Sequence, residues 1–462
     1  MDRRTFLKTV SGAAAAAAAS RFLPEDAEAM PRRMTLMAVG DCLVSRRVSE
    51  RRDPEFLELV ELLRGADCTW GNCEVVLADT REVSPGYKQF DPHAICEPWG
   101  ADELAWMGIG FVGTANNHIL DFGYEGLFAT LRNLERVGIA HAGSGVDLGA
   151  AARPAYYDTP AGRVGQVNCA STFPPYFAAG LAHPHLKGRP GLNPLQVSSA
   201  VQVPAKLFEE MRKAQATLVD LMGWGEFGDF VKELEERMPK GTSIFFEMTI
   251  ASGDKVDILG QTSPLDVQRI TDAIGTARNN SRMVIASIHS HEARRGLDFN
   301  DLFQEKFARA CIDAGADCYV SSGPHVLRGV EIYKGKPIFY SLGNFLFQYE
   351  TISPVPPEAL AGLGLDPFTL DPSLYYKKIP YGEGRRFWES FVPRVTFEEG
   401  KVVEVELFPI SLGFEEPAYH RGTPALAKGA EAQSILERIV RLSEPFGTKI
   451  DIQEGIGRIR LA

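Results

Sequence analysis

Apolar and polar positions along the N-terminal third of the chain predict strands and helices in turn. Residues 34–40, MTLMAVG, form an apolar run that predicts a buried strand ending at Asp41. Residues 53–66 then place apolar side chains at helical spacing, with Asp53 as a cap and Pro54 suited to the first turn. Alternation of this kind predicts an α/β fold.

Later segments predict antiparallel hairpins. Residues 153–159 and 162–171 predict two strands around a Pro-Ala-Gly turn, and residues 391–399 and 401–410 predict two more around a glycine. Because hairpins join an alternating pattern of strands and helices, we expect two sheets packed face to face with helices outside.

The same pattern suggests how the chain is divided. We expect a separate segment over residues 1–29, a core domain over 30–412 and a C-terminal extension over 413–462. Two segments rich in Pro and Gly, about 172–280 and 351–386, interrupt the core pattern. Insertions of this length in a compact domain are usually lids or binding loops.

The first insertion has its own predicted elements. A long amphipathic helix is expected over about 204–238, and a hairpin over 243–261 that turns at residues 252–254. His183 and His185 precede both elements. We expect them to belong to a solvent-facing lid, and a metal ligand from this lid is the alternative.

The N-terminus predicts export. Arg3 and Arg4 are followed by Phe6 and Leu7, then by an Ala-rich run and the small residues Ala27 and Ala29 at the spacing that a signal peptidase accepts. This order is typical of a twin-arginine signal, which predicts a periplasmic or extracellular protein. A basic, disordered start on an intracellular protein is the alternative. No later segment has the run of about 18 apolar residues that a membrane span needs, so the mature chain is expected to have none.

Composition narrows the function classes. The chain has 462 residues and a formal net charge of −11, which argues against nucleic acid as a partner because phosphate binding needs basic faces. Seven cysteines, an odd number with no CxxC pair, predict buried thiols and no disulfide framework.

Polar side chains recur where predicted strands end. Asp41, Glu74, Asn117, His289 and His325 all occupy such positions. Each one alone is explained equally well as a turn residue, a helix cap or a buried histidine. Together they are ligands that suit a divalent metal such as Mn, Fe, Zn or Mg, and loops at strand ends of α/β folds commonly build sites.

Five stretches together resemble a known family. They are VGDCLVSRR, GNCE, TANNHILDFG, SIHSHE and GPHVLRGVEIYKGKPIFYSLGNFLF. In combination they are similar to the CapA family of capsule or poly-γ-glutamate synthesis proteins, over residues 34–172 and 282–348. The resemblance implies a four-layer α-β-β-α sandwich of the metallophosphatase type, and it places the protein beside the capsule machinery of the cell envelope.

The resemblance also implies roles for individual residues. Metal ligands are expected at Asp41, Glu74, Asn117, His289 and His325, with Glu74 bridging two ions. The expected catalytic pair is His118, which acts at the substrate oxygen, and Asp121, which orients it. Substrate contacts are expected from Asn116, Glu292, Asn344 and Arg294. The implied cofactor is one or two divalent ions.

The chain departs from the family pattern in three places, one of which is the IHSHE stretch, where His-Trp-Gly is often found. Leu43 stands where a second early histidine is usual, and Ser322 stands where a histidine often precedes the final Pro-His. His291 or Glu292 could replace a lost ligand, and alternation along an extended run places His289 and His291 on the same face, which favours His291. We therefore expect a metal-dependent hydrolase acting on an anionic polymer or phosphoester. A non-catalytic protein that binds a polyanion in a degenerate metal cleft is the alternative.

Overall fold

A computed structural model describes residues 33–86, 88, 92–246, 248–379 and 382–461. The expected export signal over 1–29 lies outside the described residues.

The first sheet carries the predicted N-terminal strand near its middle. Its strands are β1 (Arg33–Leu43), β2 (Cys68–Cys73), β5 (Phe111–Gly113), β6 (Ala140–Ala142), β19 (Asn344–Phe347), β20 (Glu389–Glu398), β21 (Lys401–Ser411), β22 (Ala425–Leu426), β23 (Ile450–Gln453) and β24 (Ile456–Ile459). Among described residues the order is β23-β24-β21-β20-β1-β2-β5-β6, with β19 on β1 and β22 on β21. The segment after residue 412 thus adds strands to the core sheet.

The second sheet holds the later histidines. Its strands are β8 (Ala155–Thr159), β9 (Gly162–Ala170), β15 (Met283–His289), β16 (Cys318–Ser322), β17 (Val330–Tyr333) and β18 (Lys336–Phe339). Their order is β17-β18-β16-β15-β9-β8, and β9, β15, β16 and β18 run parallel. The predicted hairpins are present as β8–β9 and β20–β21.

Strand β1 explains how the sheets pack. Met34, Leu36 and Ala38 belong to the core between the two sheets, together with residues of β9, β15 and β16. Met37 and Val39 belong instead to the core that the first sheet shares with its helices. This division follows from the strand period of two, because successive side chains point to opposite faces.

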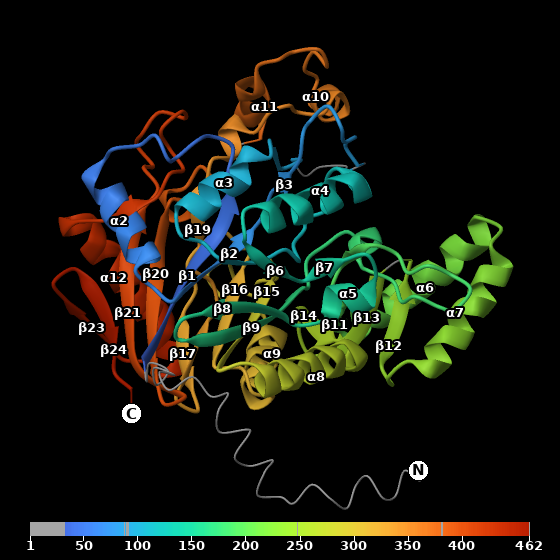
Figure 1. Ribbon diagram of the computed structural model, residues 1–462. Coiled ribbons are helices and arrows are strands. Elements are labelled where there is room, and N and C mark those ends of the chain that lie inside the picture. The colour runs from blue at the N-terminus through green and yellow to red at the C-terminus, as the bar shows by residue number, and fades with distance from the viewer. Residues whose placement is uncertain (1–32, 87, 89–91, 247, 380–381, 462) are drawn as a thin grey trace, which may run out of the picture.

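Helices cover the outer faces (Figure 1). On the first sheet lie α2 (Pro54–Arg64), α3 (Trp99–Trp106) and α4 (Gly123–Arg136), and on the second lie α8 (Pro264–Asn280) and α9 (Leu302–Asp313). Helix α12 (Gly429–Ser443) packs into the core between the sheets beside β21. The predicted four-layer sandwich is confirmed.

Short elements complete the connections: β3 (Val76–Leu77), β4 (Ile95–Cys96), β7 (Ser144–Gly145), β10 (Gly191–Leu192) and α5 (Leu148–Ala152). Within the described ranges, none of the helices has both the length and the apolar character that crossing a bilayer would require.

The first insertion forms a small unit at one end of the molecule (Figure 1). It contains β11 (Val197–Pro204), β12 (Thr242–Phe245), β13 (Met248–Gly253), β14 (Asp257–Thr262), α6 (Ala205–Leu221) and α7 (Gly225–Arg237). The single helix predicted over 204–238 is wrong, since two helices are separated at Gly223, where φ is 69°. Glycine adopts this left-handed conformation without strain.

The predicted hairpin over 243–261 is also wrong. The strand order is β12-β13-β11-β14, so β11 lies between β13 and β14. Strand β13 pairs with β11 in parallel, and its hairpin partner is β12. The chain does reverse its direction after residues 252–254, as predicted. The strand beside β13 on that side, however, is β11 and not β14.

The second insertion packs against the end of the first sheet. It includes α10 (Pro357–Gly362) and α11 (Pro372–Lys378). Ring contacts run from Tyr376 to Tyr349 at 5.5 Å, from Tyr349 to Phe347 at 4.6 Å, and from Phe347 to His325 at 5.6 Å between centroids. An aromatic wall therefore connects this insertion to a predicted ligand.

Candidate metal centre

The two sheets bring their polar strand ends together. Strands β1 and β2 are neighbours in the first sheet, with Asp41 paired in register to Asn72, and Glu74 directly follows β2. His289 ends β15 of the second sheet, and His325 follows β16. The carboxylates of Asp41 and Glu74 and the imidazole of His289 are fully buried. Residues from both halves of the chain thus form one cluster.

Glu74 lies at the centre of this cluster. Its Oε1 is 3.5 Å from His289 Nε2, 3.7 Å from His325 Nε2 and 3.9 Å from His118 Nε2, yet this buried oxygen has no hydrogen-bond partner. Two groups of possible ligands share it: Glu74 with His289 and His291, and Glu74 with Asp41 and His325. The ligand atoms of each group lie within 4.8 Å of one another, and those bound about 2.1 Å from one ion would lie roughly 3.0–3.4 Å apart, so the side chains of either group would draw together around an ion.

Asn117, next to His118 in the chain, carries another unpartnered acceptor. Its Oδ1 is buried and has no hydrogen-bond partner. Leaving such an oxygen unsatisfied costs free energy, which binding of a cation would remove. Carboxylate, amide and imidazole donors together suit Mn, Fe or Zn, so the residues present fit a site for one or two divalent ions.

His289 and His291 face each other, with their Nε2 atoms 2.9 Å apart. β15 ends at His289 and His291 lies just beyond it in the following loop, and the two rings lie on the same side, as predicted. The loop is held by a hydrogen bond from His291 N to Thr172 Oγ1 at 2.8 Å and by Arg328, which donates to Glu292 O at 2.9 Å. Burial lowers the pKa of His289 to about 3 and also lowers that of His291, so both rings are neutral and able to bind a metal.

The two acidic ligands have opposite electrostatic environments. Burial and the nearby charge of Asp41 raise the pKa of Glu74 well above its usual value. Burial also works against ionisation of Asp41, but His325, His289 and Asn72 outweigh it and lower the Asp41 pKa. The cluster therefore holds one firmly ionised carboxylate and one carboxyl that a cation would deprotonate.

His118 lies between the cluster and a buried carboxylate. Its Nδ1 donates to Asp121 Oδ2 at 2.7 Å, which leaves Nε2 directed toward Glu74. Asp121 also accepts from Ala94 N at 2.7 Å and forms an ion pair with Lys88 Nζ at 2.6 Å. The imidazole is thus fixed in one orientation, as a group that exchanges protons at a substrate oxygen requires.

Asn116 and Asn344, both expected to contact substrate, instead bond to protein. Asn116 donates to Cys73 O at 2.8 Å and accepts from His118 N at 3.0 Å, which shapes the turn that presents His118. Asn344 Oδ1 accepts from His325 Nδ1 at 2.6 Å, which leaves His325 Nε2 for a ligand. Partners of this kind fix the tautomer and orientation of metal-binding histidines.

Glu292 and Arg294 are also engaged away from the cluster centre. Glu292 Oε2 accepts from Ser171 Oγ, Thr172 Oγ1 and Ser290 Oγ at 2.7–2.8 Å. Arg294 pairs with Asp257 of the first insertion at 2.6 Å.

The remaining predictions concern Leu43 and Ser322, which stand where the family usually has histidine, and the two histidines of the predicted lid. Leu43 is buried in the core between the first sheet and its helices. Ser322 donates to Ile288 O at 3.5 Å. His183 and His185 are exposed and contact each other, with ring centroids 5.7 Å apart.

Two residues of the site were not anticipated. Asn72 Nδ2 lies 2.8 Å from Asp41 Oδ1, 3.4 Å from Glu74 Oε2 and 3.2 Å from His289 Nδ1, so one amide touches three predicted ligands. Lys88 is the cation paired with Asp121. Asn72 could have been predicted, because it lies two residues before Glu74 at the end of the same strand. Lys88 lies in a loop, and its local sequence gave no indication that it would contact the site.

Comparison with known proteins gives consistent results. A family model described as bacterial capsule synthesis protein PGA_cap matches residues 35–349. The uncharacterized protein y4sH of Sinorhizobium fredii (strain NBRC 101917 / NGR234) is 35% identical over 92% of this chain and 93% of its own length. The capsule biosynthesis protein CapA of Bacillus anthracis is 23% identical over 68% of this chain and 60% of its length. The NAD nucleotidase NadN of Haemophilus influenzae covers 88% of this chain and 55% of its own, at 10% identity and a TM-score of 0.30, which is too low to identify a shared fold.

Proposed function

The chain belongs to the family of bacterial capsule synthesis proteins described as PGA_cap, as its motifs indicated, and we propose that it is a metal-dependent hydrolase of an anionic polymer or ester in capsule or poly-γ-glutamate production. The observation that carries this proposal is the buried, unpartnered Glu74 Oε1 among three histidine Nε2 atoms. A carboxylate placed in this way serves two ligand groups, which is what a bridging ligand of two ions requires.

The ligands would be Asp41, Glu74, Asn117, His289, His291 and His325. When bound, divalent ions supply electrophilic stabilisation of the scissile group and lower the pKa of water toward 7. His118 Nε2 protonates the departing oxygen, while Asp121 holds the opposite ring nitrogen and Lys88 holds Asp121. Asn116 fixes the backbone of this turn through Cys73 O.

A polyanion-binding protein without hydrolytic activity is the second candidate. The observation in its favour is that Leu43 is buried in the apolar core and Ser322 bonds to a backbone carbonyl, so neither replaces the histidine usual at its position. His291 offsets that loss in the hydrolase proposal, because its Nε2 lies beside that of His289.

Metal content separates the two candidates. We expect about two ions per chain by mass spectrometry when the protein is purified from its native compartment without chelator. His289→Ala should lose metal, and His118→Ala should keep metal and lose hydrolysis of a chromogenic phosphodiester. Native protein without stoichiometric metal, or a His289→Ala variant with intact activity, would contradict the hydrolase proposal.

We further propose export by the twin-arginine route to the periplasm or cell exterior, where capsule polymer is assembled. The support is the Arg3-Arg4 start and the small residues Ala27 and Ala29. Cell fractionation and N-terminal sequencing test this, and a mature start near Met30 is expected. An uncleaved chain in the cytoplasmic fraction would overturn it.

A further inference from the structure

The side-chain amide of Asn72 contacts both groups of possible metal ligands. Asn72 is buried on β2 and pairs in register with Asp41 on β1. Its Nδ2 is 2.8 Å from Asp41 Oδ1, in one group, and 3.2 Å from His289 Nδ1, in the other. Glu74, which both groups share, places Oε2 3.4 Å from the same nitrogen. An amide nitrogen has two hydrogens to donate, so it cannot satisfy all three contacts at once.

Asp41 determines which way this amide points. The carboxylate of Asp41 only accepts hydrogen bonds, so the atom of Asn72 that faces it is the nitrogen. The same nitrogen faces His289 Nδ1, and since an amide nitrogen only donates, Nδ1 is the acceptor. A neutral imidazole carries its proton on one ring nitrogen. The proton of His289 therefore lies on Nε2, the atom that is 2.9 Å from His291 Nε2.

This proton position is the wrong one for metal binding by His289. A histidine binds a metal through a ring nitrogen that carries no proton, and His289 Nε2 is the nitrogen that faces Glu74 Oε1 and His291. For Nε2 to bind, the proton must be on Nδ1, where it needs an acceptor. Asn72 Oδ1 is buried at the same place and accepts no hydrogen bond from any described residue. The missing acceptor is thus the other end of the same amide.

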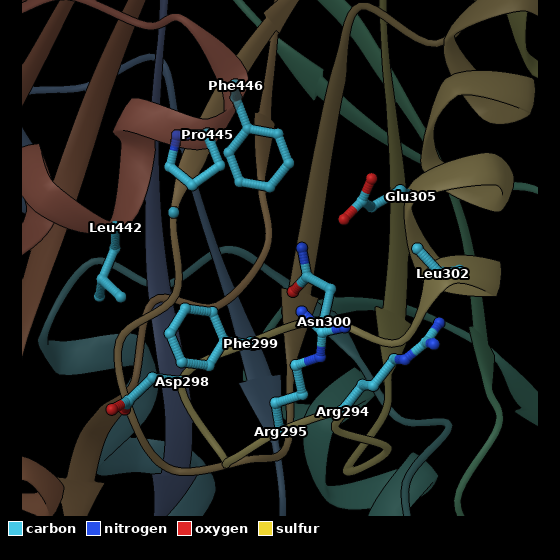
Figure 2. A pocket seen from close by; sticks show the side chains of 11 residues that line it. Arg294, Arg295, Asp298, Phe299, Asn300, Leu302, Glu305, Leu442, Pro445 and Phe446 are labelled. Atoms are coloured by element: carbon cyan, nitrogen blue, oxygen red, sulfur yellow. The ribbon is translucent and has the colours of Figure 1, made fainter. Parts of the chain in front are cut away.

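The acidic side chains of the loop after β15 are engaged elsewhere. Glu292 Oε2 accepts from three hydroxyl groups at 2.7–2.8 Å. Asp298 lines a separate cavity with Arg295, between this loop, the start of α9 and the segment after α12 (Figure 2). Asp298 forms an ion pair there with Arg438 at 2.8 Å. Asn72 therefore remains as the acceptor for the imidazole proton.

We propose that Asn72 is a positioning residue whose side-chain amide reverses when the centre binds metal. In the reversed position, Oδ1 accepts from His289 Nδ1 and leaves His289 Nε2 without a proton. Oδ1 then also faces Asp41 Oδ1, and two acceptors in contact repel each other. Reversal is therefore favourable only when a cation holds the Asp41 carboxylate. The inference rests on the proposed function only in that divalent ions bind here.

The reversal couples the two groups of possible ligands. When Asp41 holds an ion, Asn72 Nδ2 no longer has to donate to it. The amide then turns and prepares His289 to hold a second ion with His291. Coupling of this kind is reciprocal, so either ion raises the affinity for the other. One buried amide thus makes the two halves of the centre fill together.

Calorimetric titration of the full, chelator-treated chain with Zn²⁺ tests the coupling. Asn72→Ala removes the acceptor and should weaken binding by about 10- to 100-fold, the usual cost of losing such a partner. Asn72→Asp keeps an acceptor for His289 and should bind at least as tightly as the native protein. Its ratio of second-ion to first-ion affinity should nevertheless fall by about fivefold or more, because it cannot donate to Asp41. Asn133→Ala is the matched control, since Asn133 lies on α4 and donates to Leu77 O.

Nitrogen NMR of protein with isotope-labelled histidine reads the proton position directly. In the native protein, the proton of His289 should lie on Nε2 without metal and on Nδ1 with Zn²⁺, and His289→Gln assigns the signal. Asn72→Asp should carry it on Nδ1 in both states. A purely structural Asn72 would leave the proton position unchanged. Thermal melts confirm folding, and the native protein and Asn72→Asp test the proposal if Asn72→Ala does not fold.

Two results would overturn the proposal. They are unchanged Zn²⁺ affinity in Asn72→Ala and a proton already on His289 Nδ1 in the metal-free native protein. Failure of the hydrolase proposal is recognised separately. Protein that binds Zn²⁺ with coupling that depends on Asn72, yet hydrolyses no phosphodiester, would refute the hydrolase and support the role of Asn72. An active metalloenzyme whose Asn72 variants bind Zn²⁺ like the native protein would do the reverse, and protein that binds no Zn²⁺ would refute both.

Discussion

Glu74 Oε1 lies 3.5 Å from His289 Nε2, although Glu74 follows a strand of the first sheet and His289 ends a strand of the second. The contact spans the interface between the two sheets, so the metal centre depends on how the sheets pack. Substitutions that loosen the packing between the two sheets should therefore weaken metal binding even where each sheet keeps its own structure.

Glu74→Gln should weaken metal binding, because Glu74 belongs to both groups of possible ligands, and it should reduce the metal content by one ion or more. In metal-free protein the same change should raise the free energy of unfolding by about 1 kcal/mol at pH 8, because it removes a buried carboxyl. The pKa of Glu74 is raised in the folded state, so it destabilises the fold above its unfolded pKa, and the gain should shrink as pH falls toward 4. Denaturant titration measures both effects, with exposed Glu236→Gln as the control. A less stable metal-free Glu74→Gln protein would contradict this reading.

Metal binding should release protons. Burial raises the pKa of Glu74, whereas the bound form must be ionised, so affinity should increase with pH until Glu74 is ionised in the free protein. Calorimetry in buffers of different ionisation enthalpy gives the number of protons released. His289 should contribute none near neutral pH, because its pKa is about 3. A binding enthalpy independent of buffer would refute the prediction.

His118→Gln should keep the metal and lose catalysis. The expected fall in kcat is about 10²- to 10⁴-fold, the usual contribution of a positioned acid or base. Metal analysis and steady-state kinetics on the same preparation separate the two roles. His141→Gln serves as the control, since His141 lies on β6 and contacts Glu135 at 3.4 Å. Loss of metal in His118→Gln would make His118 a ligand.

Gly40→Ala should disrupt the site through the backbone. A Cβ at Gly40 would lie 1.8 Å from Gly343 O, where β1 and β19 approach each other just before Asp41. Relief of this clash must move Asp41 or Asn344, and we expect a loss of about 3 kcal/mol in stability together with weaker metal binding. Gly275→Ala on α8 has nothing within 4 Å of the new Cβ and should stabilise by about 0.5 kcal/mol. Thermal melts of both variants, with and without metal, check the contrast.

The sequence alone predicted the layers and most of the residues that the fold gathers into the candidate site. The apolar run over residues 34–40 predicted a buried strand, and β1 contributes to two cores. Asp41, Glu74, Asn117, His289 and His325 were candidates because each was expected where a strand ends, and the family resemblance implied their roles as ligands. These features depend on local periodicity and on where strands end, and both can be inferred from residues that are close together in the sequence.

Tertiary structure alone decided which polar atoms have partners and which strands pair. Asn344 turned out to orient His325, Lys88 came from a loop to neutralise Asp121, and β11 inserted between β13 and β14. The cavity beside Arg295 likewise needs α9 and the segment after α12 to close it. Hydrogen-bond satisfaction, strand pairing and cavity shape depend on groups far apart in the chain, so a local pattern carries no information about them until the chain has folded.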